Sequence, residues 1–152
     1  MTDRKLQLTT HGYDELDRRT LTTWPGGATT AFTYDAGDRL TQVTDSVSGT
    51  ITRTYDIRFD ALVTETVPLG AGTSTTTSTY DTAGRRTQMQ VIGQSAVTYG
   101  YDDANRLTSI TQGANAVGFT YDEASRRTLA TLPNGVTIDY GYDNVRARFG
   151  GG

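Results

Sequence analysis

The chain has 152 residues, of which 14 are Lys or Arg and 17 are Asp or Glu, so its formal net charge is −3. Both signs are spread along the chain, which excludes the basic patch that a nucleic-acid or anionic-membrane binder requires. The chain has no cysteine, which excludes disulfides, thiol catalysis and cysteine-ligated metals.

The dipeptide Tyr-Asp recurs seven times, and successive tyrosines lie 21, 21, 25, 21, 20 and 21 residues apart. Repetition at one period over a whole chain indicates a repeat architecture, in which each copy forms one supersecondary unit. We therefore expect residues 1–152 to form a single array, whose repeats begin near Tyr13, Tyr34, Tyr55, Tyr80, Tyr101, Tyr121 and Tyr142.

The residues before each Tyr-Asp pair predict a β-strand. Thr, Tyr, Val and Ile dominate these segments, and apolar residues alternate with polar ones. Val117, Phe119 and Tyr121, for example, would share one face of an extended chain. We expect strands of about five to seven residues, half-buried on one side.

The residues after each pair predict a tight turn. Counting Tyr as position one, position five is Asp, Gly, Asn or Ser in five of the seven repeats, and these residue types accept a turn. We expect the Asp of the pair to fasten the turn by accepting hydrogen bonds from backbone N–H groups.

A return strand follows the turn, so that each repeat is one β-hairpin. Position six is usually Arg, as at Arg39, and a strand-like segment comes after it. Leu40 and Val43 in that segment lie three residues apart and cannot share a face of a regular strand. A β-bulge, a bend or contacts on both faces would each explain this spacing.

Further turn signals between the repeats, such as Trp24-Pro25-Gly26-Gly27 and Pro133-Asn134-Gly135, complete the pattern of strand, turn, strand, turn. The predicted fold class is therefore all-β. We expect an antiparallel meander of about seven β-hairpins that forms a curved, open ribbon.

Two repeats depart from the pattern. The third has Phe59 at position five, and its outgoing half is longer by four residues. We interpret the Thr-rich residues 70–79 as a loop that enters a long polar strand, with a binding loop as the alternative. The seventh repeat has no return strand after Tyr142-Asp143, so we expect it to be truncated.

Residues 33–41, Thr-Tyr-Asp-Ala-Gly-Asp-Arg-Leu-Thr, and residues 101–108 resemble the YD repeats of the rearrangement-hotspot (Rhs) family. Leu132-Pro133-Asn134-Gly135 resembles the Pro-Asn-Gly linkers of the same proteins. The resemblance covers nearly the whole chain. It implies an arc of a β-sheet shell, which in bacterial members encloses a C-terminal toxin and in the animal teneurins belongs to a cell-surface receptor.

On this resemblance we expect a non-catalytic structural segment of an Rhs-type shell that encapsulates a polypeptide. The cargo implied is a toxin of a bacterial polymorphic-toxin or contact-dependent competition system. The partners implied are the remainder of the shell and the cargo, without nucleic acid or membrane insertion. The resemblance implies a secreted or cell-surface location within a larger protein, and the chain contains no signal peptide or transmembrane pattern. The core-closing Asp-Pro-x-Gly-Leu segment of the bacterial proteins does not occur.

We expect no enzymatic activity, no catalytic or metal-binding residue and no cofactor. His11, the only histidine, lies beside Gly12 in an expected turn and is too isolated for a zinc site. Adjacent acids such as Asp102-Asp103 would diverge instead of flanking one bond. Structural roles are expected at the repeat positions Tyr13, Asp14, Tyr34, Asp35, Tyr55, Asp56, Tyr80, Asp81, Gly84, Tyr101, Asp102, Asn105, Tyr121, Asp122, Tyr142 and Asp143.

The repeated tyrosines admit two interpretations. In the first, each ring packs against the next hairpin and its hydroxyl reaches a polar partner, while Asp and Arg bond along the ladder. In the alternative, exposed tyrosine rows form a sugar-stacking platform, and the chain is a surface module that binds carbohydrate or a partner protein. In both cases the free edges of an open sheet predict self-association.

Overall fold

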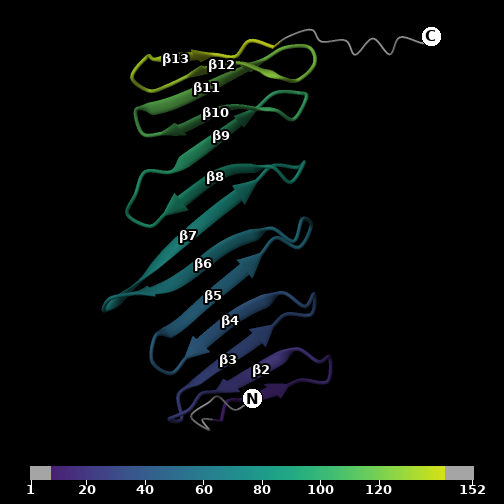
Figure 1. Cartoon of the computed structure of the whole chain (residues 1–152), viewed down its shortest axis with the longest axis vertical. Coiled ribbons are helices and arrows are strands. Elements are labelled where there is room, and N and C mark those ends of the chain that lie inside the picture. The colour runs from purple at the N-terminus through teal and green to yellow at the C-terminus, as the bar shows by residue number, and fades with distance from the viewer. Residues whose placement is uncertain (1–7, 143–152) are drawn as a thin grey trace, which may run out of the picture. The chain divides into compact units, whose positions relative to one another are not determined.

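The computed structural model describes residues 8–142, and the regular elements in this range are thirteen β-strands (Figure 1). Contacts divide the chain into two compact units, Met1–Ser95 and Ala96–Gly152. The first unit contains β1 (Thr10–Tyr13), β2 (Arg19–Thr23), β3 (Thr29–Tyr34), β4 (Leu40–Asp45), β5 (Gly49–Tyr55), β6 (Leu62–Leu69), β7 (Gly72–Tyr80) and β8 (Arg86–Val91). The second contains β9 (Val97–Tyr101), β10 (Leu107–Gln112), β11 (Asn115–Tyr121), β12 (Arg127–Thr131) and β13 (Thr137–Asp139).

Within each unit every strand pairs antiparallel with the next one along the chain. The predicted all-β antiparallel meander is confirmed. The sheets are open, because no described strand at one end of a unit pairs with the strand at its other end. The sequence predicts a single array over residues 1–152. The contacts divide the chain between Ser95 and Ala96, and the same type of hairpin occurs in both units.

Each sheet has two chemically different faces. Directly paired residues share a face, so the register assigns every strand residue to one side. We call one side of the first unit the tyrosine face; it carries Phe32, Tyr34, Leu40, Val43, Ile51, Arg53, Tyr55, Leu62, Glu65, Val67, Ser78, Tyr80, Arg86, Met89 and Val91. The opposite side, the threonine face, carries Thr33, Gln42, Thr44, Thr50, Thr52, Thr54, Thr64, Thr66, Thr73, Thr75, Thr77, Thr79, Gln88 and Gln90.

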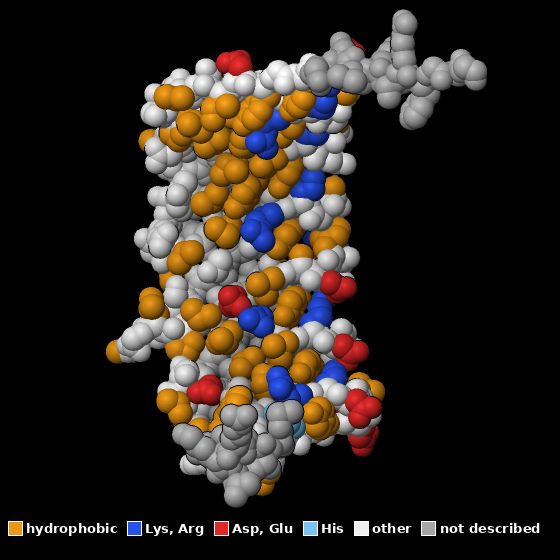
Figure 2. Space-filling model, in the orientation of Figure 1, with side chains coloured by type: hydrophobic (Ala, Val, Ile, Leu, Met, Phe, Trp, Pro, Cys, Tyr) orange, Lys and Arg blue, Asp and Glu red, His pale blue; other side chains and the backbone are white. Residues whose placement is uncertain are grey.

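The second unit continues the aromatic pattern, with Tyr99, Tyr101, Phe119, Tyr121, Leu107, Ile110 and Val117 on one side. Figure 2 shows hydrophobic side chains gathered on this side, with arginines among them. Few side chains are fully enclosed: among the described residues only Ala130, Thr22 and Ser78 are buried. Contacts between side chains on neighbouring strands therefore provide much of the stability that, in other domains, comes from a core packed between two layers.

A β-bulge explains the three-residue spacing of the apolar residues in the return strands. Leu40 pairs with Tyr34 and Gln42 pairs with Thr33, so Thr41 is an extra residue. Leu40 and Val43 consequently lie on the same face, beside Tyr34 and Phe32. The same shift separates Leu107 from Ser109. Of the three explanations that the sequence allows, the bulge is correct.

Residues 70–79 follow the expectation of a loop that enters a long polar strand: Gly70-Ala71 form a two-residue turn, and β7 then pairs with β6 from Leu69↔Gly72 to Thr64↔Thr77. The additional residues of the third repeat lengthen these strands, since β-branched Thr favours extended structure. His11 lies in β1 and not in a turn; its Nδ1 is 3.2 Å from Thr22 Oγ1. Residues 8–142 also contain no helix long and apolar enough to cross a membrane.

The outer edge of β13 predicts association between chains. Tyr140 N–H donates to Thr128 C=O at 3.0 Å, and hydrogen-bonded pairs alternate, so the N–H and C=O of Asp139 point away from β12. We expect the purified chain to self-associate, because unpaired edge groups accept another strand. Asp139→Pro should reduce association, and sedimentation velocity measures it. A stable monomer of the unaltered chain at high concentration would contradict the expectation.

Candidate functional site

In each described repeat, the aspartate of the Tyr-Asp pair accepts hydrogen bonds from its own turn. Asp35 Oδ1 accepts from the N–H groups of Gly37 at 2.8 Å and Arg39 at 3.0 Å, and Oδ2 accepts from Arg39 Nε at 2.8 Å. The same three contacts recur at Asp14, and Asp81, Asp102 and Asp122 show the Arg contacts again.

The residue at position five gives the turn its shape. It has a left-handed backbone in each regular repeat, with φ values of 59°, 62°, 77°, 62° and 61° at Asp17, Asp38, Gly84, Asn105 and Ser125. Gly, Asn and Asp tolerate this region better than other residues. The left-handed backbone conformation therefore explains why position five is Asp, Gly, Asn or Ser in the regular repeats.

The arginine at position six connects one turn to the next. Arg39 Nη1 donates to the carbonyl of Asp56 at 3.2 Å and to Asp60 Oδ1 at 2.8 Å, both in the following turn. Its guanidinium carbon also lies 5.0 Å from the centre of the Tyr55 ring. Arg18 and Arg106 make the equivalent contacts with the next repeat.

The tyrosine hydroxyl returns to the preceding hairpin. Tyr55 Oη donates to the carbonyl of Leu40 at 2.8 Å. The ladder between β4 and β5 begins at Gln42, so this carbonyl lies outside it and the hydroxyl satisfies it. Tyr34, Tyr80, Tyr121 and Tyr142 donate to the corresponding carbonyls of Arg19, Leu62, Leu107 and Arg127.

Together these contacts form a unit that we call the Asp-Arg-Tyr link: the aspartate and arginine of one repeat and the tyrosine of the next. Asp35, Arg39 and Tyr55 are one example. The sequence predicts the turn-fastening Asp and an Asp–Arg ladder, but it does not indicate that the Arg covers the following Tyr. The nearly constant separation of 15 or 16 residues between these two side chains is a signal that could have revealed it.

The link also fixes the charge of its carboxylates. The N–H of Arg39 lowers the pKa of Asp35 most, and the Arg39 side chain and the Gly37 N–H lower it further against the opposing effect of burial. The pKa values of Asp81, Asp102 and Asp122 are lowered in the same way, again led by the N–H of the arginine. These carboxylates stay ionised, and their lone pairs are occupied.

The third repeat replaces the link with an apolar contact. It has Asp60 at position six, where most repeats have arginine, and Asp60 is also the left-handed residue, one position later than elsewhere. Arg58 instead folds back onto Asp56 at 3.1 Å and lies 5.0 Å from the centre of the Phe59 ring. Phe59 then lies against Gly84 of the next turn, where an added Cβ would come within 2.9 Å of the ring. The Gly at this position therefore makes room for Phe59.

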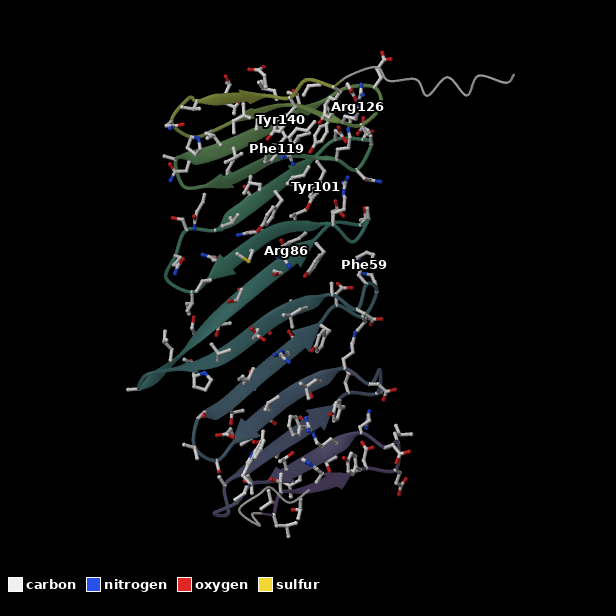
Figure 3. All side chains as sticks on the ribbon, viewed as in Figure 1. Phe59, Arg86, Tyr101, Phe119, Arg126 and Tyr140 are labelled. Carbon is white, nitrogen blue, oxygen red and sulfur yellow. The ribbon has the colours of Figure 1, made fainter. Side chains whose placement is uncertain are left out.

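A second set of arginines lies on the aromatic side of the sheets, at the first position of the return strands. The guanidinium carbon of Arg127 lies 4.4 Å from the centre of the Phe119 ring and 5.9 Å from that of Tyr140. Phe119 and Tyr140 are labelled in Figure 3. Arg19 lies 4.8 Å from the centre of the Phe32 ring. Such contacts between cation and ring are attractive at this separation.

No group of His, Cys, Asp and Glu that could hold a metal ion occurs in residues 8–142. The structure places the predicted structural positions in the strand ends and turns just described: Tyr13, Asp14, Tyr34, Asp35, Tyr55, Asp56, Tyr80, Asp81, Gly84, Tyr101, Asp102, Asn105, Tyr121 and Asp122. Tyr142 lies three residues beyond the end of β13, and Asp143 lies outside the described residues. Tyr13, in the first repeat, is 60% exposed.

Replacing the fastening carboxylate should destabilise its unit in a pH-dependent way. We expect Asp35→Asn to lower the Tm by several degrees at pH 7, because the amide cannot accept from the turn and pair with Arg39 at once. The folded pKa of Asp35 is below the unfolded value of about 3.9, so its contribution is present above about pH 4 and is lost as the pH falls further.

Thermal melts from pH 7 to pH 2 test this expectation. The Tm difference between the unaltered chain and Asp35→Asn should shrink below about pH 4. Asp38→Asn is the matched control, because its carboxylate is well exposed and accepts only from Arg18. Equal Tm changes for Asp35→Asn and Asp38→Asn would contradict the fastening role.

Gly84→Ala should destabilise the first unit for two separable reasons. The left-handed backbone at Gly84 costs an Ala about 1–2 kcal/mol, and the new Cβ would collide with Phe59. Gly93→Ala is the control, because Gly93 has φ 80° and no atom within 4 Å of an added Cβ. Urea unfolding should show a larger decrease in the free energy of unfolding for Gly84→Ala than for Gly93→Ala. Equal decreases would show that the Phe59 ring moves away from the new Cβ at no cost.

Comparison with known proteins agrees with the repeat geometry. The family model described as RHS Repeat matches residues 101–137, which contain one complete hairpin and the beginning of the next. No curated protein sequence matches the chain.

Two solved structures share the fold. The chain is similar to the crystal structure of TcdB2-TccC3-TEV, with a TM-score of 0.67 and 17% identity over 86% of this chain. It is also similar to the Tc holotoxin pore of Photorhabdus luminescens carrying the TccC3 mutation D651A, with a TM-score of 0.61 and 18% identity over 82% of this chain. The chain spans 7% of the length of each of these proteins. Residues 101–137 thus match the Rhs-repeat family model, and the chain shares the antiparallel repeat fold of these two structures.

Proposed function

We propose that this chain is a non-catalytic segment of the wall of an Rhs-type β-shell, and that the shell encloses a polypeptide, such as a toxin of a bacterial competition system. The observation that carries the proposal is the recurrence of the Asp-Arg-Tyr link. A site that serves a ligand occurs once, whereas a contact repeated between successive hairpins serves the wall they form.

The hydrogen bonds of the repeated Asp and Tyr side chains support a structural role. The repeated carboxylates accept hydrogen bonds from their own turns, and the tyrosine hydroxyls donate to backbone carbonyls. General acid–base catalysis needs a carboxyl group that can exchange its proton near neutral pH, and a lowered pKa opposes that. We therefore propose that the chain has no catalytic activity of its own.

The tyrosine face supports an enclosed partner. It presents aromatic and aliphatic side chains that no described element covers, and an apolar surface of this kind is a site of protein interaction. One of the structures that the chain resembles is a Tc holotoxin pore, which favours a toxin as the cargo and a secreted location. The alternative of a glycan-binding module is less well supported, since an arginine covers one side of Tyr34, Tyr55 and Tyr121.

The gene that encodes this chain tests the proposal. We expect the reading frame to extend into further Tyr-Asp repeats and a cargo domain, and we expect the longer product to protect that domain from trypsin. Gel analysis of the digest should show an intact cargo in the folded product and a cleaved cargo after denaturation in urea. A cargo domain that trypsin cleaves as fast in the folded product as in urea would contradict enclosure.

A further inference from the structure

A hollow in the first unit combines an aliphatic lining with a carboxylate. It has a volume of about 240 Å³, and the residues that line it include Val43, Ile51, Val67, Pro68 and Asp45. The register places Val43, Asp45, Ile51 and Val67 on the tyrosine face. We call this space the Asp45 hollow.

Pro68 explains why the sheet opens at this point. The pairing of β5 with β6 ends at Thr52, so Ile51 pairs only with β4 and Val67 pairs only with β7. Proline has no N–H to donate to a neighbouring strand. The Pro68 ring lies instead against Gly49, where an added Cβ would come within 3.0 Å of Pro68 Cγ. The ends of β5 and β6 therefore separate and leave a space between aliphatic side chains.

Neutral donors hold the Asp45 carboxylate in its ionised form. Oδ1 accepts from the N–H groups of Val47 at 3.0 Å and Ser48 at 2.8 Å, and Oδ2 accepts from the Thr30 hydroxyl at 2.9 Å. The N–H of Ser48 lowers the pKa of Asp45 most, and the N–H of Val47 and the Thr30 hydroxyl lower it further, to about 2. Asp45 is therefore negatively charged at neutral pH.

This negative charge has no cationic partner within residues 8–142. The other carboxylate that β3 to β8 place on the tyrosine face belongs to Glu65, and it is paired with Arg53 at 2.7 Å. Asp45 is bonded only by the neutral donors just described. A ligand that brings a positive charge would complete the site.

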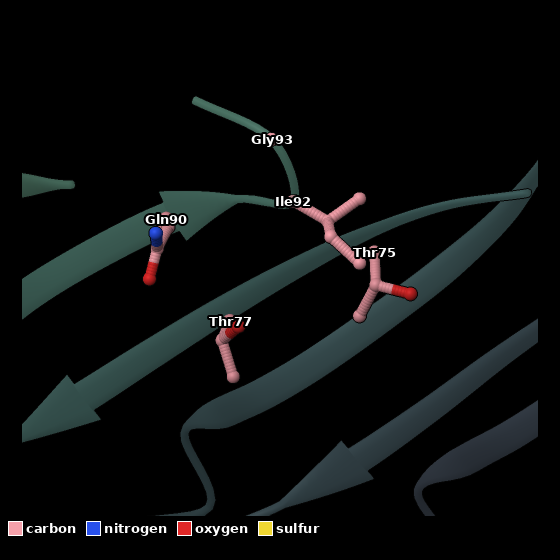
Figure 4. A pocket seen from close by; sticks show the side chains of 5 residues that line it. All are labelled: Thr75, Thr77, Gln90, Ile92 and Gly93. Atoms are coloured by element: carbon pink, nitrogen blue, oxygen red, sulfur yellow. The ribbon is translucent and has the colours of Figure 1, made fainter. Parts of the chain in front are cut away.

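A second hollow in the first unit lacks this chemistry. It has a volume of about 180 Å³, lies on the threonine face and is lined by Thr75, Thr77, Gln90, Ile92 and Gly93 (Figure 4). None of these side chains is charged, so nothing in that hollow selects a cation. The Asp45 hollow is the more specific of the two.

The Asp45 hollow fits a side chain that is apolar along its length and cationic at its end. Lysine and arginine have this form, because they lay an aliphatic stem along apolar surface and keep the charged group on a polar partner. A guanidinium binds a carboxylate best when it forks onto both oxygens, whereas an ammonium is a point charge. Two N–H groups already occupy Oδ1 of Asp45, which favours the ammonium. An added strand is a poorer occupant, since Pro68 offers it no N–H.

We propose that the Asp45 hollow binds a lysine side chain of the enclosed polypeptide, with the stem against the aliphatic lining and the ammonium on Asp45 Oδ2. This inference rests on the proposed function, because it takes the cargo as the source of the lysine. It adds a chemical requirement, which is that the cargo presents lysine to the tyrosine face. The test below uses a free peptide, so its failure would leave the result of the trypsin experiment unaffected.

A flexible Gly-Ser peptide that carries lysines is the probe. The anisotropy of a fluorescein-labelled form gives its Kd for the purified chain. The emission of Trp24, the only tryptophan, reports where the unlabelled form binds, because Trp24 Nε1 donates to Thr30 and the Thr30 hydroxyl donates to Asp45. We expect saturable binding that changes the Trp24 emission. The same peptide with norleucine keeps the stem without the charge and should bind about fivefold more weakly.

Asp45→Asn should also raise the Kd of the lysine peptide about fivefold, because the ion pair is lost. Asp38→Asn is the matched control, since it removes the same charge from a well-exposed carboxylate and should leave the Kd unchanged. Val67→Phe, which fills the hollow without changing its charge, should weaken binding as well. Circular dichroism and the Tm establish that each variant folds.

Three results would overturn the proposal. The first is that the unaltered, folded chain does not bind the lysine peptide. The second is that the norleucine peptide binds equally well. The third is that Asp45→Asn and Asp38→Asn weaken binding equally, which would show a response to net charge alone.

Discussion

The Asp-Arg-Tyr link is the interaction on which the rest of this structure depends. One guanidinium bonds the carboxylate of its own turn, reaches the following turn and lies over the next tyrosine, as Arg39 does with Asp35, Asp56 and Tyr55. A single exposed ion pair contributes little to stability, but these contacts share donors and acceptors and recur along the sheet. Because the link bonds successive hairpins in the regular repeats, and Phe59 packs on Gly84 in its place in the third, the repeats can form an ordered sheet with few fully buried side chains.

The β-bulge of each hairpin and the alternation along its strands divide the side chains between the two faces of the sheet. The bulge after each turn brings Leu40 and Val43, or Leu107 and Ile110, onto the side of the tyrosines. The other side then receives the residues that must only favour extended structure, which explains its threonines. The sheet of the first unit therefore has one side with aromatic, aliphatic and charged residues and one side with neutral hydroxyl groups.

Much of the fold could be predicted from the sequence because each repeat encodes its own hairpin. The Tyr-Asp period, the alternation before it and the residue types at position five predict the strands and turns without reference to other repeats. Contacts between repeats were harder to predict. The Tyr55 hydroxyl donates to the backbone carbonyl of Leu40, and a residue of any type at that position would offer the same carbonyl. The length of the loop in residues 70–79 was also not predictable, because a Thr-rich run suits a loop or a strand and pairing with β6 decides where the strand begins.

The central claim is that arginine couples each hairpin to the next, and a double-mutant cycle measures that coupling most directly. Arg39→Gln and Tyr55→Leu would be made singly and together, and the free energy of unfolding would be compared with a second cycle of Arg39→Gln and Tyr80→Leu. The account predicts that the first pair is non-additive, because Arg39 lies over Tyr55, and that the second pair is additive. Additive effects in the first cycle would contradict the coupling of successive repeats through the Asp-Arg-Tyr link.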